Sequence, residues 1–202
     1  MFCLKTSTDA SWAPLAAKDL DAVLVDHAQC ELKAAQNALS LAARHPENIR
    51  VARALADLAR EEADHFGRVL GFLEKRGVAL TWPGVDTYAA TLRTVSKSLP
   101  HSTLGHLVDR LLVASLIEAR SCERFKLLLE SPVLKADPEL FAFYTELFAC
   151  EARHYRVFVD LAIDAANGNA AAVEARLELL ANAEAKITEG LVGNSSRAAM
   201  HG

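Results

Sequence analysis

Two long stretches of apolar residues at helical spacing are each interrupted near the middle by the same pair, Glu-x-x-His. In the first stretch the pair is Glu62 and His65, and in the second it is Glu151 and His154. Residues three apart lie on one face of a helix, so each Glu and His shares the face of the apolar side chains. Charged groups on such a face are expected to be buried, so they need a counter-charge, and few folds supply one.

Each stretch is preceded by another helical segment that carries one Glu on its apolar face. These two residues are Glu31 and Glu118. Glu31 precedes Glu62 by 62 − 31 = 31 residues, and Glu118 precedes Glu151 by 151 − 118 = 33 residues. Each half of the chain therefore supplies one core Glu, a turn, and then Glu-x-x-His.

Four carboxylates in a helical core predict a metal site. An uncompensated buried charge costs several kcal/mol, whereas two divalent ions offset four negative charges. Carboxylate and imidazole ligands favour iron or manganese over copper(I) or structural zinc. Such a ligand set is typical of ferritin-like di-metal carboxylate proteins. The predicted metal ligands are Glu31, Glu62, His65, Glu118, Glu151 and His154, with no catalytic residue beyond them.

The remaining pattern predicts an all-α fold: a ferritin-like four-helix bundle with one long crossover and an additional C-terminal helix. The breaks follow Pro and Gly, and candidate caps include Gly77, Ser102, Thr103, Asp137 and Asn169. Residues 1–190 are expected to form a single ferritin-like di-iron domain, and residues 191–202 a flexible C-terminal tail. The predicted helices span about residues 15–44, 46–76, 88–97, 104–130, 138–167 and 170–189.

Some neighbouring residues compete for a place in the site. Helical register directs Glu61 and Glu123 away from the core, so we expect both to be solvated. His27, one turn before Glu31, is either a donor to that carboxylate or an ordinary core histidine, and the second interpretation is the simpler. The four cysteines form no Cys-x-x-Cys pair, which argues against a zinc or iron–sulfur site, and the three in helical stretches are expected to be buried thiols.

Charge and hydropathy narrow the location and the partners. The formal net charge is −4, which indicates no general affinity for nucleic acid. The sequence contains neither an apolar run of membrane-spanning length nor a signal-peptide pattern, so we expect a cytoplasmic protein without a membrane partner. Basic residues at helix ends and in the crossover are candidates for nucleic-acid contacts, but ordinary solvated charges are the simpler interpretation: Lys5, Arg76, Arg93, Lys97 and Arg110.

Four segments around the predicted ligands resemble the bacterial MiaE-type tRNA hydroxylases that act on 2-methylthio-isopentenyladenosine. The similarity extends from about residue 12 to residue 184, and Ile-Glu-Ala-Arg-Ser-Cys-Glu-Arg-Phe is its most specific part. The four segments are 26–35, 58–66, 116–125 and 150–155.

The resemblance implies a di-iron, oxygen-dependent monooxygenase that hydroxylates the isopentenyl side chain of this nucleoside in tRNA. Two iron ions would be the cofactor and molecular oxygen a co-substrate. Glu62 and Glu151 would bridge the irons, Glu31 and Glu118 would be terminal ligands, and each histidine would hold one iron. No flavin or iron–sulfur motif is present, so a separate electron-donor protein is expected, and the oligomeric state stays open.

A different class of function is an iron storage or peroxide detoxification protein of the ferritin or rubrerythrin type. The missing cysteine-rich electron-transfer module argues against a rubrerythrin. A purely structural bundle would leave the four core carboxylates unexplained.

Overall fold

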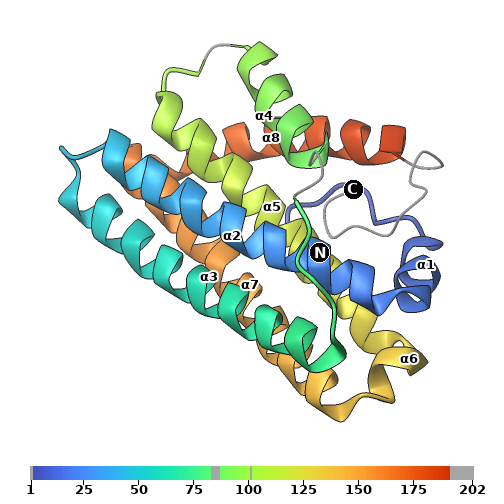
Figure 1. The fold of residues 1–202 in the computed structure, drawn as a ribbon. Coiled ribbons are helices and arrows are strands. Elements are labelled where there is room, and N and C mark those ends of the chain that lie inside the picture. Colours follow the sequence, from blue (N-terminus) through green and yellow to red (C-terminus); the bar gives the residue numbers. More distant parts are fainter. Residues whose placement is uncertain (1, 83–86, 101, 192–202) are drawn as a thin grey trace. The chain divides into compact units, whose positions relative to one another are not determined.

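The computed structural model describes residues 2–82, 87–100 and 102–191, and every regular element in these ranges is a helix (Figure 1). The chain divides into two compact units, Asp19–Val85 and the combination of Met1–Lys18 with Asp86–Gly202. No helix within the described ranges is both long enough and apolar enough to cross a membrane. The helices are α1 (Trp12–Lys18), α2 (Leu20–Arg44), α3 (Ile49–Arg76), α4 (Thr87–Ser98), α5 (His106–Glu130), α6 (Pro132–Lys135), α7 (Pro138–Ala165) and α8 (Ala170–Leu191).

The smaller unit is a hairpin of two long helices, α2 and α3, which pack along their length. The helix predicted from residue 15 is wrong at its start, because Asp19 breaks it into α1 and α2. Asp19 leaves the helical conformation, and its side chain accepts the Ala22 N–H at 2.9 Å as an N-cap. At the far end of α3 the predicted cap is confirmed: Gly77 adopts a φ of 66°, which side chains disfavour.

Pro46 does not open α3, which was the expectation from sequence. It lies in the turn between α2 and α3, and α3 begins at Ile49. Asn48 caps the helix by accepting the Val51 N–H at 3.1 Å. The first N–H groups of a helix have no partner within the helix, and an amide side chain at the N-cap satisfies one of them.

The larger unit is built on the pair α5 and α7, with α8 in contact with α4, α5 and α7. The caps predicted for α7 and α8 are confirmed, since Asp137 accepts the Leu140 N–H and Asn169 accepts the Ala172 N–H. α5 begins at His106 after Gly105, so Ser102 and Thr103 are not its caps. Ser102 instead accepts the Leu104 N–H within the connecting segment. The short helix α6 was not predicted.

A buried ion-pair network joins the parts of this unit around Arg120, whose side chain is fully buried. Its guanidinium donates to Glu184 of α8 at 2.7 and 3.0 Å and to Glu123 at 2.5 Å. Glu123 also accepts the Thr8 N–H and hydroxyl from the N-terminal segment. The expectation that Glu123 is solvated is therefore wrong, because a buried cation from the same helix draws it inward.

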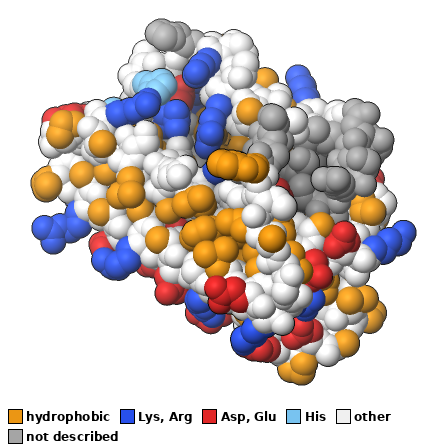
Figure 2. Space-filling view, in the orientation of Figure 1, with side chains coloured by type: hydrophobic (Ala, Val, Ile, Leu, Met, Phe, Trp, Pro, Cys, Tyr) orange, Lys and Arg blue, Asp and Glu red, His pale blue; other side chains and the backbone are white. Residues whose placement is uncertain are grey.

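Basic side chains gather on one part of this unit. Figure 2 shows Lys and Arg side chains with a histidine in the upper part of the view, over α4 and the start of α5.

The predicted tail, 191–202, lies outside the described residues apart from Leu191, the last residue of α8. A single domain over residues 1–190 stays a prediction.

Candidate metal centre

The α2–α3 hairpin brings three of the predicted ligands together. Glu31, Glu62 and His65 each offer an oxygen or nitrogen atom, and these atoms lie within 4.8 Å of one another. His65 Nδ1 is 3.5 Å from a Glu31 oxygen and 3.6 Å from a Glu62 oxygen. All three side chains are buried, so the heptad register predicted for both helices is confirmed at these positions.

His27 is bonded to one of these carboxylates. Its Nε2 lies 2.5 Å from Glu31 Oε1, and its side chain is 1% exposed. A histidine that is hydrogen-bonded to a carboxylate ligand fixes the orientation of that ligand and increases the affinity for the metal. Of the two interpretations weighed from sequence, the structure supports the donor to Glu31 over the ordinary core histidine.

The α5–α7 pair brings the other three predicted ligands together within the larger unit. Atoms of Glu118, Glu151 and His154 lie within 4.8 Å of one another, and all three residues are buried. His154 Nδ1 is 3.8 Å from Glu151 Oε2, which is too long for a hydrogen bond. Within the described ranges, that buried carboxylate oxygen has no hydrogen-bond partner. A buried anionic oxygen in this state is compensated when a cation binds to it.

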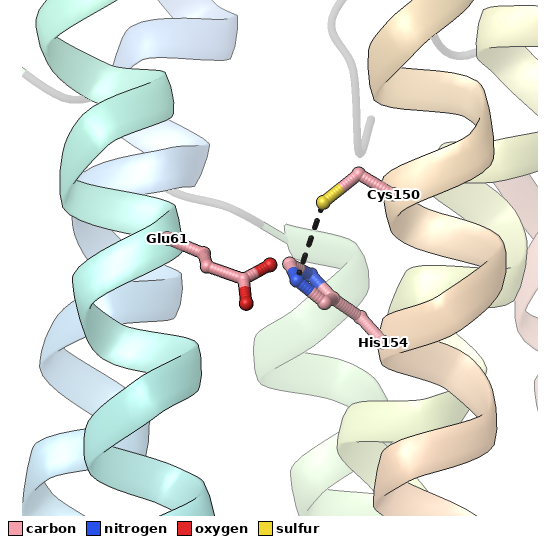
Figure 3. Close-up of side chains that lie close together, drawn as sticks. All are labelled: Glu61, Cys150 and His154. Atoms are coloured by element: carbon pink, nitrogen blue, oxygen red, sulfur yellow. Dashed lines mark hydrogen bonds between the residues drawn. The ribbon is translucent and has the colours of Figure 1, made fainter.

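Cys150 adds a contact that sequence reasoning missed. Figure 3 shows Cys150 and His154 one turn apart on α7, with the hydrogen bond between the thiol and His154 Nε2 drawn as a dashed line. The two atoms are 3.4 Å apart, and the Arg153 guanidinium donates to the same sulfur at 3.0 Å. Nε2 is thus engaged by the thiol, and Nδ1 is the nitrogen that lies 3.8 Å from Glu151 Oε2. The available signal was the spacing of four residues, which places the Cys and His on one face.

Two other residues, Cys122 and Glu61, lie close in sequence to the predicted ligands, and burial distinguishes them from solvated groups. Burial, and then the charge of Glu151, raises the pKa of Cys122 to about 12. Its thiol donates to the Phe148 carbonyl, so it is a protonated core residue, as expected for these cysteines. Glu61 of α3, also drawn in Figure 3, is half-buried rather than solvated.

The donor atoms of both triads fit a divalent transition metal. Each triad consists of two carboxylates and one imidazole, the hard and borderline ligands that iron and manganese accept. Two carboxylates so close together in a buried place repel each other, and a proton or a cation relieves that repulsion. Each unit thus carries one buried triad suited to a metal ion.

Comparison with known proteins identifies the family. The sequence model of one family, described as tRNA-(MS[2]IO[6]A)-hydroxylase (MiaE), matches residues 1–201. The chain belongs to the MiaE family. A relative from Pseudomonas putida KT2440 is 38% identical over 182 residues, covering 90% of this chain and 84% of the relative. A relative from Salmonella typhimurium LT2 is 31% identical over 192 residues, covering 72% and 68%. Both are named tRNA 2-(methylsulfanyl)-N(6)-isopentenyladenosine(37) hydroxylase.

A solved structure also resembles this MiaE-family chain closely. It is described as protein 43 with aldehyde deformylating oxygenase activity from Synechococcus, with a TM-score of 0.86 and 36% identity. The match covers 100% of this chain and 96% of the other. The all-α, ferritin-like fold class predicted from sequence is confirmed, and so is the resemblance to the tRNA hydroxylases.

Proposed function

We propose that this chain hydroxylates the isopentenyl side chain of 2-methylthio-isopentenyladenosine in tRNA, as an oxygen-dependent di-iron monooxygenase. Membership of the MiaE family supports the reaction, and the names of both relatives support the substrate. The observation that carries the metal assignment is the pair of buried Glu/Glu/His triads, one on α2–α3 and one on α5–α7.

The proposed centre contains two irons, for which the six residues of the two triads would be the ligands. A triad of three residues leaves an iron short of its usual coordination number, and carboxylates that bridge two ions supply further bonds to both. Glu62 and Glu151 would bridge the irons, as the family resemblance implies. Glu31 and Glu118 are the proposed terminal ligands, and His65 and His154 each hold one iron.

When bound, the irons supply the oxygen activation that hydroxylation of a C–H bond requires. One oxygen atom enters the product, the other leaves as water, and a separate donor protein supplies the two electrons. The chain's own residues position the ligands: His27 holds Glu31, and Cys150 engages the far nitrogen of His154. Burial of all six proposed ligands keeps bulk water from competing for the metal. The donor protein and a cytoplasmic location stay predictions.

The direct test supplies tRNA that carries the 2-methylthio-isopentenyl nucleoside, together with a reductant and oxygen, to protein reconstituted with ferrous iron. We expect about two irons per chain and a mass gain of one oxygen on that nucleoside. No mass gain with a fully loaded, reducible protein would refute the reaction. Iron loading far beyond that ratio would instead favour the storage function.

A matched pair of variants on α5 links the reaction to the triad. Glu118→Ala removes a buried proposed ligand, and we expect loss of hydroxylation and of iron while the helical content survives. Glu130→Ala removes an exposed carboxylate at the end of the same helix, and we expect parental activity. Full activity in Glu118→Ala would show that this residue is not a ligand.

A second candidate function comes from the solved structure with aldehyde deformylating oxygenase activity, because its identity of 36% over the whole chain is high. The same iron-loaded preparation should therefore be assayed with an aldehyde under the same reductant and oxygen. Turnover of the aldehyde with no change in the tRNA would favour this second function.

A further inference from the structure

A pocket of about 380 Å³ lies in the larger unit, where α4, α5 and α8 meet. Four basic residues and one carboxylate are among the residues that line it, so the lining is strongly positive despite the negative charge of the whole chain. These five are Arg93, Lys97, Arg110, Arg176 and Asp109.

The carboxylate is already compensated inside the pocket wall. Arg176 is 6% exposed and forms two hydrogen bonds of 2.8 Å to the two oxygens of Asp109. Its third contact is a donation to the Pro100 carbonyl at 2.9 Å, which fastens the segment between α4 and α5. This bidentate pair forms part of the pocket wall, and Arg93, Lys97 and Arg110 add further positive charge to the lining.

Those three cations belong to two helices. Arg93 and Arg110 are half-buried, and Lys97 is exposed at the end of α4. From sequence, ordinary solvated charge was the simpler interpretation of all three. Their convergence on one cavity is a tertiary feature, and like charges held together in this way are stabilised when an anion binds between them.

The beginning of α5 adds a second attraction for an anion. Gly105 and His106 line the pocket, and the N-cap Gly105 provides no side-chain hydrogen bond to the first turn. Its φ of 90° is in the region that favours glycine, so a capping residue such as Ser or Asp would be strained there. The first N–H groups of a long helix, with the positive end of its dipole, favour a phosphate.

We propose that this pocket binds a backbone phosphate of the tRNA substrate, within a few nucleotides of the modified adenosine. The inference rests on the proposed function, which makes a tRNA loop the substrate. The volume accommodates a phosphate with its sugar rather than a whole loop. Phosphate contacts of this kind position a nucleic acid without reading its sequence.

The spacing along α5 suits this role. Arg110 and the proposed ligand Glu118 are eight residues apart on one helix, a rise of about 12 Å at ~1.5 Å per residue. Along the axis of a stacked helix, neighbouring phosphates of one strand are spaced by ~3.4 Å, and an extended loop spaces them farther apart. A phosphate in the pocket is therefore a few nucleotides from a base directed toward Glu118.

The test measures binding of iron-loaded protein to an anticodon stem-loop RNA that carries 2-methylthio-isopentenyladenosine, at several salt concentrations. The pocket variant combines Arg93→Gln, Lys97→Gln and Arg110→Gln. The control variant removes the same charge from exposed positions of the same unit that do not line the pocket, and combines Lys126→Gln, Lys135→Gln and Lys186→Gln.

We expect the pocket variant to bind the RNA at least about tenfold more weakly, with a salt dependence smaller by about one released counterion. Its KM for tRNA should rise more than its kcat falls, and its iron content should match that of the control. Equal weakening in both variants, or parental affinity in the pocket variant, would overturn the pocket assignment. RNA binding by the parent protein without any hydroxylation would overturn the proposed function instead. The two outcomes are distinguishable because RNA affinity is measured independently of hydroxylation.

Discussion

Glu184 provides a stringent test of what holds the larger unit together. One of its oxygens accepts four hydrogen bonds: two from Arg120 at 2.7 and 3.0 Å, one from Tyr88 at 2.9 Å and one from Thr188 at 2.9 Å. Glu184 and Arg120 have fully buried side chains. Glu184→Ala therefore leaves a buried guanidinium without its main counter-charge.

The expected loss of stability follows from this geometry. Removing one partner of a buried ion pair destabilises a protein by about 3–5 kcal/mol. Arg120 keeps Glu123, whose side chain is 12% exposed, so we expect a loss near the lower end, about 3 kcal/mol. In a chain of this size that corresponds to a fall in Tm of roughly 6–12 °C. Urea and thermal unfolding followed by circular dichroism measure both quantities.

A matched control lies on the same helix. Glu178 forms an exposed ion pair with Lys5, and Glu178→Ala should lose about 0.5 kcal/mol or less. The double variant Arg120→Met with Glu184→Leu removes both charges, and it should be no less stable than Glu184→Ala alone. A loss below about 1 kcal/mol in Glu184→Ala would refute the reasoning. So would strict additivity of the stability losses of Arg120→Met and Glu184→Leu in the double variant.

Two further predictions concern the α2–α3 hairpin. His27→Ala removes the partner of Glu31, so a ferrous titration should show iron affinity lower by about 10–100-fold, whereas His45→Ala, in the loop after α2, should leave it unchanged. Equal affinities in the two variants would contradict the role given to His27. Gly77→Ala should lose about 1 kcal/mol because its φ is 66°, whereas Gly67→Ala inside α3 should gain about 0.5–1 kcal/mol, both measured by urea unfolding. A gain of stability in Gly77→Ala with a loss in Gly67→Ala would show that backbone conformation does not determine the stability of these variants.

The sequence by itself determined the helical fold class and the faces that carry the six proposed ligands. Both follow from local periodicity, because residues three or four apart on a helix share a face whatever the helix packs against. The buried positions of Glu62, His65, Glu151 and His154 agree with that register. The caps Asp137 and Asn169 were also readable, since a cap bonds to a residue three positions away.

Only the tertiary structure decided which residues support those ligands and which cations act together. Glu123 is drawn inward partly by Thr8, which is 115 residues away in the chain, and no local pattern records such a contact. Arg93 and Arg110 likewise line one pocket because α4 and α5 pack together. Contacts between distant segments depend on how helices dock, and helical periodicity restricts the buried face without specifying the partner that covers it.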